Sequence, residues 1–366
     1  MKILYVTTVG TTMNFFRAFI RRLLDEGNEV HIATNQNISM VSDCYENWGC
    51  KIYPLSCVRS PLNIGNIEAI KQIKKIVEEN SYDIVHCHTP IAAMCTRIAC
   101  IKTRKKGTKV FYTAHGFHFY KGAPFKNWMM YYPVEKLCAR LTDVLITINK
   151  EDYNFARKKI KAKLISYVPG VGIDVDKFKN ISIDVKAKKK EMNIPENKKL
   201  LLSVGELDIF KNHETVIRAI KDMDNVYYLV AGEGNLHQYL DGIIKELDLG
   251  DRVRLLGYRK DILELCAIAD IFVFPSTREG LPVSLMEAMA SSLPCVVTKI
   301  RGNTDLIDES GGTFFEPRNV ADCKKAIEKV LSKNLISMGE YNANKVCSFG
   351  NQAVFCEMQS LYEKKF

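Results

Sequence analysis

The stretch Phe272–Val297, which reads FVFPSTREGLPVSLMEAMASSLPCVV, decides the fold of the second half of this 366-residue chain. An apolar run, Ile271–Phe274, predicts a buried strand, and Ser284–Ala290 has the apolar spacing of a helix. Pro294–Thr298 predicts the next strand, and Pro282 suits the first position of the helix. A strand, a turn, a helix and another strand in this order are typical of a parallel α/β sheet.

The turn that opens the helix places two carboxylates, Glu279 and Glu287, on either side of a Gly-Leu-Pro sequence. The first amides of a helix have no intrahelical acceptor, and such amides attract phosphate oxygens. The turn therefore predicts a site for a phosphorylated ligand. The amides expected to take part are those of Gly280, Leu281, Val283 and Ser284.

Strand and helix patterns alternate along the rest of the chain in the same way. The first half opens with a strand at Lys2–Thr7, a helix at Phe15–Leu24 and a strand at Glu29–Ala33, and the pattern starts again at Lys199–Val204. We therefore expect two α/β domains in tandem, each with a parallel, doubly wound sheet. Because ligands of such sheets bind at the carboxyl ends of the strands, two facing domains would enclose a cleft.

The boundary between the domains is predicted from a segment rich in Gly, Pro and Lys, residues 168–199, which has little periodicity. Such a composition is typical of an interdomain linker, with a hinge near Pro169–Lys179. The predicted domains are residues 1–175 and 176–349. A C-terminal helix at about 350–366 is expected to pack back on the first domain.

The net charge of +10 is concentrated in the N-terminal half. Residues 1–170 contain 25 Lys and Arg against 13 Asp and Glu. Basic runs at Lys102–Lys109 and Arg157–Lys163 could meet a lipid headgroup, a phosphate-bearing substrate or nucleic acid, or could simply be solvated. No nucleic-acid-binding signature accompanies the charge, so no nucleic-acid partner is expected.

The twelve cysteines form no C-x-x-C motif, and most, such as Cys87, Cys95, Cys266 and Cys295, lie inside apolar runs. They are typical of buried thiols in a reducing compartment. No apolar run reaches about 18 residues, the length that crosses a bilayer. The first ten residues read as a strand and turn rather than a signal peptide. We therefore expect a cytoplasmic or peripheral protein.

The stretch around Glu279 and Glu287 resembles the E-x7-E signature of retaining nucleotide-sugar glycosyltransferases of family four, which have the GT-B fold of two Rossmann-like domains. The resemblance covers most of the chain. It implies an N-terminal acceptor-binding domain and a C-terminal domain that binds a nucleotide-sugar donor. The supporting segments are VPGVGID (168–174), SVGELDIFKNH (203–213), VAGEG (230–234), LLGYRKDI (255–262) and TAHGFHFY (113–120).

The resemblance implies roles for the charged residues of the C-terminal half. Glu287 should accept hydrogen bonds from ribose hydroxyls, and the catalytic Glu279 should bind the transferred sugar and stabilise positive charge at its anomeric carbon, because a carboxylate can take a vicinal diol. Lys211 should neutralise the leaving diphosphate. The family often has Arg where this chain has Glu206, so phosphate binding should depend more on amides and on Lys211. Arg259 is expected near the base.

His115, in TAHGFH, follows the predicted strand Lys109–Thr113. The resembling family has a histidine here that lies against the transferred sugar, so His115 is a third candidate catalytic residue. Its neutral ring could bond a sugar hydroxyl or position the acceptor. His86 and His88 have an H-x-H spacing, but no third ligand of suitable spacing is evident, which argues against a zinc site.

Two motifs favour other functions only weakly. Asp174 and Asp176 form a D-x-D pair, but they lie in the predicted linker, so capping or turn chemistry is the better interpretation. Gly232–Gly234 lacks the third glycine of G-x-G-x-x-G, and the opening loop TTVGTT has only Gly10, so a dinucleotide dehydrogenase is poorly supported. Gly10 is kept as a candidate donor-binding residue. GT-B enzymes generally need no divalent ion, so no cofactor is expected.

The segment FHFYKGAPFKNWMMYYPVEKLCAR, residues 117–140, mixes aromatic, Met and basic residues. This composition fits a surface that meets membrane lipid, and an ordinary amphipathic core helix is the alternative. The segment is similar to bacterial capsule and exopolysaccharide glycosyltransferases whose acceptors are sugars on polyprenyl diphosphate. His118, Tyr120 and Lys121 are the candidate acceptor or membrane residues.

The sequence as a whole predicts a retaining glycosyltransferase. It would move a hexose or N-acetylhexosamine from a UDP-sugar to a polyprenyl-diphosphate-linked saccharide at the inner face of the cell membrane. A nucleotide-sugar 2-epimerase, which shares the two-domain shape, is the enzymatic alternative. A noncatalytic subunit of a polysaccharide assembly complex, binding sugar nucleotide or lipid, is the alternative of another class.

Overall fold

The computed structural model describes residues 1–60, 63–179 and 181–364. The chain folds into two compact units. Met1–Gly172 and Asn351–Phe366 make unit 1, and Ile173–Gly350 makes unit 2. The first division therefore falls inside the segment in which the sequence predicts a hinge.

Unit 1 is built on a seven-stranded sheet in the order β3-β2-β1-β4-β5-β6-β7, and all of its pairs are parallel. The order changes direction between β1 and β4, as in the Rossmann arrangement, which leaves a crevice at the carboxyl ends of these two strands. The strands are β1 (Lys2–Val9), β2 (Glu29–Asn35), β3 (Lys51–Pro54), β4 (Ile84–His88), β5 (Lys109–Ala114), β6 (Val144–Thr147) and β7 (Leu164–Tyr167).

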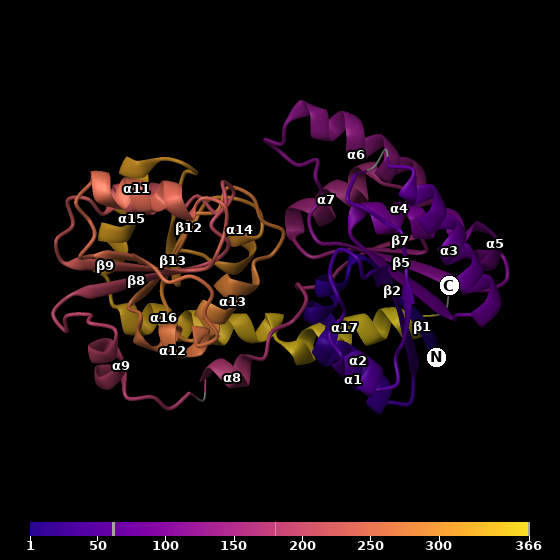
Figure 1. The fold of residues 1–366 in the computed structure, drawn as a ribbon, viewed down its shortest axis with the longest axis horizontal. Coiled ribbons are helices and arrows are strands. Elements are labelled where there is room, and N and C mark those ends of the chain that lie inside the picture. The colour runs from indigo at the N-terminus through magenta and orange to yellow at the C-terminus, as the bar shows by residue number, and fades with distance from the viewer. Residues whose placement is uncertain (61–62, 180, 365–366) are drawn as a thin grey trace. The chain divides into compact units, whose positions relative to one another are not determined.

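Helices cover both faces of this sheet (Figure 1). Successive residues of a strand point to opposite faces, so Leu4 packs in one core and Tyr5 in the other. One face is covered by α3 (Gly65–Asn80), α4 (Pro90–Ala99), α6 (Phe125–Cys138) and α7 (Lys150–Lys159). The other is covered by η1 (Gly10–Phe16), α1 (Arg17–Asp25), α2 (Cys44–Asn47) and α17 (Asn351–Glu363). The short helices α5 (Ile101–Arg104) and η2 (Ala139–Leu141) follow α4 and α6.

The C-terminal helix α17, yellow in Figure 1, belongs to unit 1 although the chain reaches it from unit 2. The Tyr362 hydroxyl lies 2.9 Å from the hydroxyl of Tyr5 on β1 and 2.5 Å from Nδ1 of His86 on β4. The Arg22 guanidinium lies 3.5 Å from the centre of the Phe355 ring. The last helix is therefore part of the core of the first unit.

Unit 2 has a six-stranded parallel sheet in the order β10-β9-β8-β11-β12-β13, with the change of direction between β8 and β11. Helices α10, α11 and α15 pack in the core on one face of it. The strands are β8 (Lys199–Val204), β9 (Val226–Ala231), β10 (Val253–Leu255), β11 (Ile271–Phe274), β12 (Cys295–Thr298) and β13 (Gly312–Phe315). The helices are α8 (Val175–Lys179), α9 (Val185–Glu191), α10 (His213–Ala219), α11 (His237–Glu246), α12 (Ile262–Ile268), α13 (Val283–Ala290), α14 (Asn303–Leu306), α15 (Val320–Leu331), α16 (Leu335–Lys345) and η3 (Val346–Phe349).

The predicted linker is more ordered than its composition indicated, since it contains α8 and α9. Lys188 of α9 lies 2.7 Å from Glu264 and 3.3 Å from Asp261, at the start of α12. These contacts to residues far along the chain stabilise a helix whose sequence has little helical periodicity.

The interpretation of Asp174 as a capping residue is confirmed, because its Oδ1 accepts a hydrogen bond from the Lys177 amide at the start of α8.

The cysteines that the sequence places in apolar runs are all buried thiols. Within the described ranges, none of the helices combines the length and the apolar character that crossing a membrane requires.

Candidate functional site

The site in unit 2 is at the point where its sheet order changes direction. β8 and β11 are neighbours in the sheet, and the loop after each strand leaves from the same edge. Residues 205–212 form the loop after β8, and residues 275–282 form the loop after β11. In open α/β sheets this crevice is where ligands bind.

Hydrogen bonds join the two loops to each other. The Thr277 amide donates to the Phe210 carbonyl over 2.7 Å, and Nδ2 of Asn212 donates to the Pro275 carbonyl over 3.1 Å. Within the first loop, Oδ1 of Asp208 accepts a 2.8 Å hydrogen bond from the Lys211 amide. The backbone that carries Lys211 is therefore fixed relative to the strand ends.

Lys211 and Glu279, both predicted as catalytic, form an ion pair with Nζ 2.7 Å from Oε1. Their side chains are 23% and 13% exposed, so the pair is largely shielded from water and weakly screened. The ammonium also lies 5.0 Å from the centre of the Phe274 ring. The crevice thus holds a cation and an anion side by side above the last residue of β11.

Arg301 is a further cation at this site, and sequence reasoning missed it. It is buried, and its Nε donates to the Glu279 carbonyl over 3.0 Å. The next residue, Gly302, has φ +79°, and a Cβ there would lie 2.5 Å from the Gly280 carbonyl oxygen. The residues after β12 therefore press against the turn that carries Glu279. The signal was present in the sequence as an Arg-Gly pair soon after an apolar strand.

The turn after β11 presents backbone amides, as predicted. Among the described residues, the amides of Gly280, Leu281, Val283 and Ser284 have no protein acceptor. The predicted place of Pro282 is wrong by one residue, because Pro282 is the N-cap, with φ −77° and ψ 122°, and α13 begins at Val283. Its carbonyl accepts the first helical hydrogen bond, from Met286. The amides left over are suited to phosphate oxygens.

Glu287 lies on α13, one turn beyond these amides, and is partly buried. Burial raises its pKa to about 7, while the charge of Lys177 on α8 acts in the opposite direction. Its carboxylate accepts no hydrogen bond from the part of the chain that the structure describes. Both oxygens are therefore available to a ligand that brings its own donors, such as a diol.

Two other predicted donor-binding residues, Glu206 and Arg259, have surroundings that favour ligand binding less. Glu206 is exposed in the loop after β8, with no hydrogen-bond partner for its side chain in the described ranges. Arg259 is bound to Asp261, with Nε 2.7 Å from Oδ1, and this contact raises the pKa of the guanidinium. Because two of its nitrogens already donate to Asp261, the Arg259 guanidinium has fewer hydrogen-bond donors available for a ligand.

The corresponding crevice of unit 1 lies between the ends of β1 and β4. Oγ1 of Thr8 and Oγ1 of Thr89 are 2.7 Å apart across it. Gly10 follows β1, and a Cβ there would lie 2.4 Å from the Ser39 carbonyl oxygen, so this position excludes any larger residue. Gly10 is thus explained by the packing of unit 1, and its predicted role in donor binding stays a prediction.

His115 lies beside this crevice, directly after β5, and the residue is half-buried. Its Nε2 is 3.1 Å from Nδ1 of His88, the last residue of β4. His86, two residues earlier on β4, binds Tyr362 and, over 2.8 Å, Oγ1 of Thr113. Burial lowers the pKa of His115 to about 4 and that of His86 to about 3, so both rings are neutral at physiological pH. Within the described ranges, no group of three or more His, Cys, Asp or Glu could hold a metal ion.

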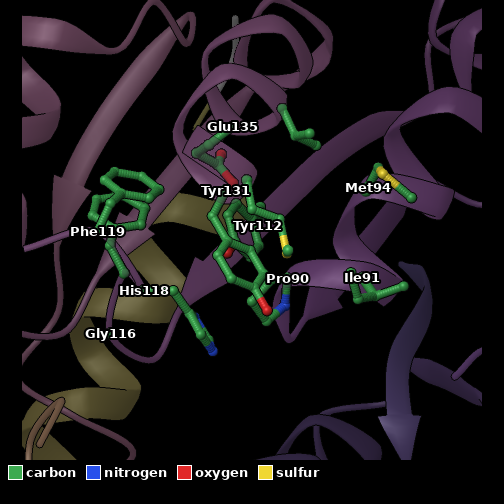
Figure 2. A pocket seen from close by; sticks show the side chains of 12 residues that line it. Pro90, Ile91, Met94, Tyr112, Gly116, His118, Phe119, Tyr131 and Glu135 are labelled. Carbon is green, nitrogen blue, oxygen red and sulfur yellow. The ribbon is translucent and has the colours of Figure 1, made fainter. Parts of the chain in front are cut away.

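A small pocket, mostly apolar, lies under the next residues of the same loop (Figure 2). Its volume is about 30 Å³, room for roughly one water molecule. His118 and Met94 both line it, and the ring of His118 lies 4.6 Å from the ring of Tyr131 on α6. Glu135 also lines the pocket and forms a buried ion pair with Arg97 at 2.6 Å. Of the predicted acceptor residues, His118 therefore lines this pocket, whereas Tyr120 and Lys121 are not among the residues that line it.

The helix beside this pocket, α6, exposes several large apolar side chains. Phe125 is 75% exposed, Met129 63% and Leu137 66%. Their spacing places Phe125 and Met129 one above the other on the helix surface. Lys121 precedes the helix and Lys126 lies in its first turn, and both are exposed.

Comparisons with known families cover both units. The family described as "Glycosyl transferases group 1" matches residues 184–345, and the family described as "Glycosyl transferase 4-like" matches residues 2–149. The first match includes the Lys211 loop and α13, and the second includes His88 and His115.

Among curated proteins, the chain is 32% identical to EpsD of Bacillus subtilis (strain 168), over 99% of this chain and 96% of EpsD. It is 29% identical to the UDP-Gal:alpha-D-GlcNAc-diphosphoundecaprenol alpha-1,3-galactosyltransferase of Escherichia coli, over 87% of each chain. It is also 24% identical to the N,N'-diacetylbacillosaminyl-diphospho-undecaprenol alpha-1,3-N-acetylgalactosaminyltransferase of Campylobacter jejuni, over 100% of this chain and 99% of the other.

Among solved structures, Anabaena HepE in complex with UDP matches with a TM-score of 0.81 and 18% identity, over 99% of each chain. WaaG, a glycosyltransferase involved in lipopolysaccharide biosynthesis, matches with a TM-score of 0.76 and 18% identity, over 99% of this chain and 100% of WaaG. These similarities confirm the predicted GT-B architecture of two Rossmann-like domains.

Proposed function

The chain belongs to the group 1 glycosyl transferases, and we propose on this premise that it moves a hexose or N-acetylhexosamine from a UDP-sugar to a saccharide carried on polyprenyl diphosphate. The anomeric configuration of the sugar is retained. The observation that carries the proposal is the pairing of Lys211 with Glu279 at the switch point of unit 2, beside amides that have no acceptor among the described residues. This arrangement suits a ligand with a negative diphosphate and a sugar rich in hydroxyl groups.

The diphosphate is bound by the turn after β11 and by Lys211. Its oxygens take hydrogen bonds from the amides of Gly280, Leu281, Val283 and Ser284, where the start of α13 favours negative charge. The Lys211 ammonium, which is held close to these amides by its contact with Glu279, neutralises charge that accumulates on the leaving phosphate. Because the amides and the ammonium are in position before the reaction begins, they lower the activation barrier for departure of the phosphate.

The two carboxylates bind the sugars of the donor. Glu287 accepts hydrogen bonds from the ribose hydroxyls, since its oxygens have no protein donors among the described residues. Glu279 binds the hydroxyls of the transferred sugar and stabilises positive charge at the anomeric carbon. Arg301 on the Glu279 carbonyl keeps this carboxylate in place.

The reaction exchanges one bond at the anomeric carbon. The bond from that carbon to the β-phosphate oxygen breaks, and a bond to the acceptor oxygen forms on the same face of the sugar. The acceptor hydroxyl gives its proton to the departing UDP. No divalent ion takes part, so the activity should survive EDTA.

The acceptor is bound by unit 1. Two relatives are named for acceptors on diphosphoundecaprenol, which supports a lipid-linked saccharide for this chain as well. His115 and His118 lie on the loop after β5, where they can meet the acceptor sugar. The exposed apolar residues of α6, with Lys121 and Lys126, form a surface that suits an anionic membrane, so we place the enzyme on the cytoplasmic face of the cell membrane. The product belongs to a capsule or exopolysaccharide.

The purified protein should be incubated with a panel of UDP-sugars and with lipid-linked saccharides extracted from bacterial membranes. Appearance of a longer lipid-linked saccharide, with the new linkage in the same anomeric configuration as the donor, is the expected result. An inverted linkage would contradict retention. Conversion of the UDP-sugar without acceptor would identify an epimerase, and binding without turnover would identify a noncatalytic subunit.

A further inference from the structure

His88 is a buried residue that has no role in the proposed reaction. Its side chain is only 1% exposed, and it lies at the carboxyl end of β4, in the crevice of unit 1. Its Nδ1 is 3.1 Å from Nε2 of His115. Its other nitrogen, Nε2, is fully buried and has no hydrogen-bond partner in the part of the chain that the structure describes.

The contact between the two rings needs one proton, and there are two ways to place it. Either Nδ1 of His88 donates to Nε2 of His115, or Nε2 of His115 donates to Nδ1 of His88. Burial lowers the pKa of both imidazoles, so each ring carries a single proton at physiological pH. The choice therefore fixes the tautomer of both rings.

The surroundings of His88 decide between the two arrangements. If His115 donated, the single proton of His88 would lie on Nε2, as a buried N–H with no acceptor, and an orphaned N–H is costlier and rarer than an orphaned acceptor. A nearby ring face could accept such a proton only if it faced the edge of His88. The rings of Tyr5, Phe16 and His86 instead lie at 13°, 30° and 35° to it, closer to parallel than to perpendicular.

We propose that His88 is a positioning residue that donates from Nδ1 to His115 and so holds His115 in the tautomer with its proton on Nδ1. Nε2 of His115 is then occupied as an acceptor. Nδ1 of His115, which has no protein partner within the described residues, presents an N–H to the ligand. His115 thus acts as a hydrogen-bond donor to a sugar or phosphate oxygen, and it is not the base that deprotonates the acceptor.

The packing of the His88 ring against two aromatic rings restricts its rotation. The ring centres of Phe16 and Tyr5 lie 4.2 and 5.6 Å from that of His88, so the imidazole has little freedom to turn. Phe16 comes from η1 and Tyr5 from β1, which means that the orientation of the His115 donor depends on the core of unit 1. This inference about orientation rests on the proposed function only for the identity of the ligand.

The tautomer can be observed directly, without activity. Protein labelled with ¹⁵N at its seven histidines should be studied by long-range ¹H–¹⁵N correlation, with the signals of His88 and His115 assigned from His88→Asn and His115→Asn. We expect the wild-type spectrum to show a protonated Nδ1 on both rings. A proton on Nε2 of His115 in the wild-type protein would overturn the proposal.

Kinetics provide a second test. His88→Phe keeps the ring packing and removes the donor, so kcat should fall by about 10- to 100-fold with little change in KM. In His88→Asn the amide nitrogen takes the place of Nδ1 and should restore most of the lost rate. Equal rates in wild type and His88→Phe would contradict the proposal, and so would equal losses in both variants with unchanged melting temperatures. If the spectra agree but no donor and acceptor pair gives a product, the proposed function fails while the histidine pair stands.

Discussion

The ammonium of Lys211 lies 2.7 Å from Oε1 of Glu279, although the two residues are 68 positions apart in the chain. One comes from the loop after β8 and the other from the loop after β11, the two strands between which the order of the sheet changes direction. Without a ligand each residue neutralises the other. We expect a diphosphate at Lys211 to replace the carboxylate as its partner, which would free Glu279 for the sugar.

Replacement of Lys211 tests this exchange. In Lys211→Met the cation is lost and Glu279 keeps an unpaired charge in a shielded site. We expect turnover to fall by about 10²- to 10³-fold, as for removal of one group that stabilises a transition state. Steady-state kinetics with saturating donor measure the change. Lys245→Met removes an exposed lysine on α11 and should have wild-type turnover. A Lys211→Met enzyme that is as active as this control would remove Lys211 from the mechanism.

Glu206 offers a gain-of-function experiment. It is an exposed acid in the loop that carries Lys211, where its charge would repel a bound diphosphate. Glu206→Arg places a second cation near the proposed leaving group and should tighten UDP binding by roughly 2- to 5-fold, with the modest energy of an exposed ion pair. Isothermal titration calorimetry with UDP at two salt concentrations measures it, and the gain should shrink at high salt. Unchanged affinity would show that the diphosphate does not reach this loop.

Gly302 tests the contact behind Glu279. Ala at this position would meet both an unfavourable φ of +79° and a Cβ 2.5 Å from the Gly280 carbonyl oxygen, so the turn at Glu279 must shift. We expect Gly302→Ala to lose about 1–3 kcal/mol of stability and most of its UDP affinity. Gly242→Ala is the matched control, because no atom lies near its Cβ and it should stabilise α11 by about 0.5–1 kcal/mol. Normal UDP binding by Gly302→Ala would separate this turn from the donor site.

The raised pKa of Glu287 predicts a dependence of stability on pH. The folded protein keeps this proton up to about pH 7, whereas the unfolded chain releases it near 4.5, so stability is lost as the pH rises through this window. Glu287→Gln cannot ionise. It should melt at nearly the wild-type temperature at pH 4 and at a higher temperature at pH 8, by at most about 3 kcal/mol of stability. Thermal melts of both proteins at the two pH values provide the measurement.

The same carboxylate should bind a diol best when ionised. Donor affinity of the wild type should therefore increase as the pH rises through about 7, and this dependence should disappear in Glu287→Gln. An equal pH dependence of donor binding in the two proteins would assign it to another group.

The exposed face of α6 predicts binding to lipid. The double variant Phe125→Ser, Met129→Ser removes two large apolar side chains that are 75% and 63% exposed. It should sediment with vesicles containing anionic phospholipid about 10-fold less than the wild type, since each buried methylene group contributes about 0.8 kcal/mol. Ile336→Ser, at an exposed apolar residue of unit 2, is the control. Equal sedimentation of all three proteins would contradict a membrane role for this helix.

Much of the fold could be predicted from the sequence because its central strands are continuous apolar runs. β8 and β11 have the predicted ends, since strands of a parallel sheet that are buried on both faces read as nearly continuous apolar runs. The edge strand β3 was not predicted, because it is only four residues long and includes half-buried and exposed positions. Helix α9 depends on ion pairs with residues far along the chain, which no local pattern reveals.

The candidate site was predictable only where a residue follows a strand in a recognisable turn. Glu279 and Lys211 satisfy this condition, and the structure places them in contact. Arg301 also follows a strand, β12, but its role depends on its hydrogen bond to the Glu279 carbonyl, a contact between two loops that appears only in three dimensions. His88 was considered as a metal ligand and set aside, and its pairing with His115 depends on the register of β4 beside β5.

The chain enters and leaves unit 2 at neighbouring points. Ile173 and Gly350, the first and last residues of that unit, form a parallel bridge, and Asn351 directly after it lies against Gly172 directly before it. Unit 2 is therefore an insertion in the sequence of unit 1, and the two ends of this insertion are in contact. Exchanging residues 173–350 with the equivalent part of a relative should therefore create a chimaera that keeps its own α17, and with it the core around Tyr362, while it acquires the sugar nucleotide preference of the other protein.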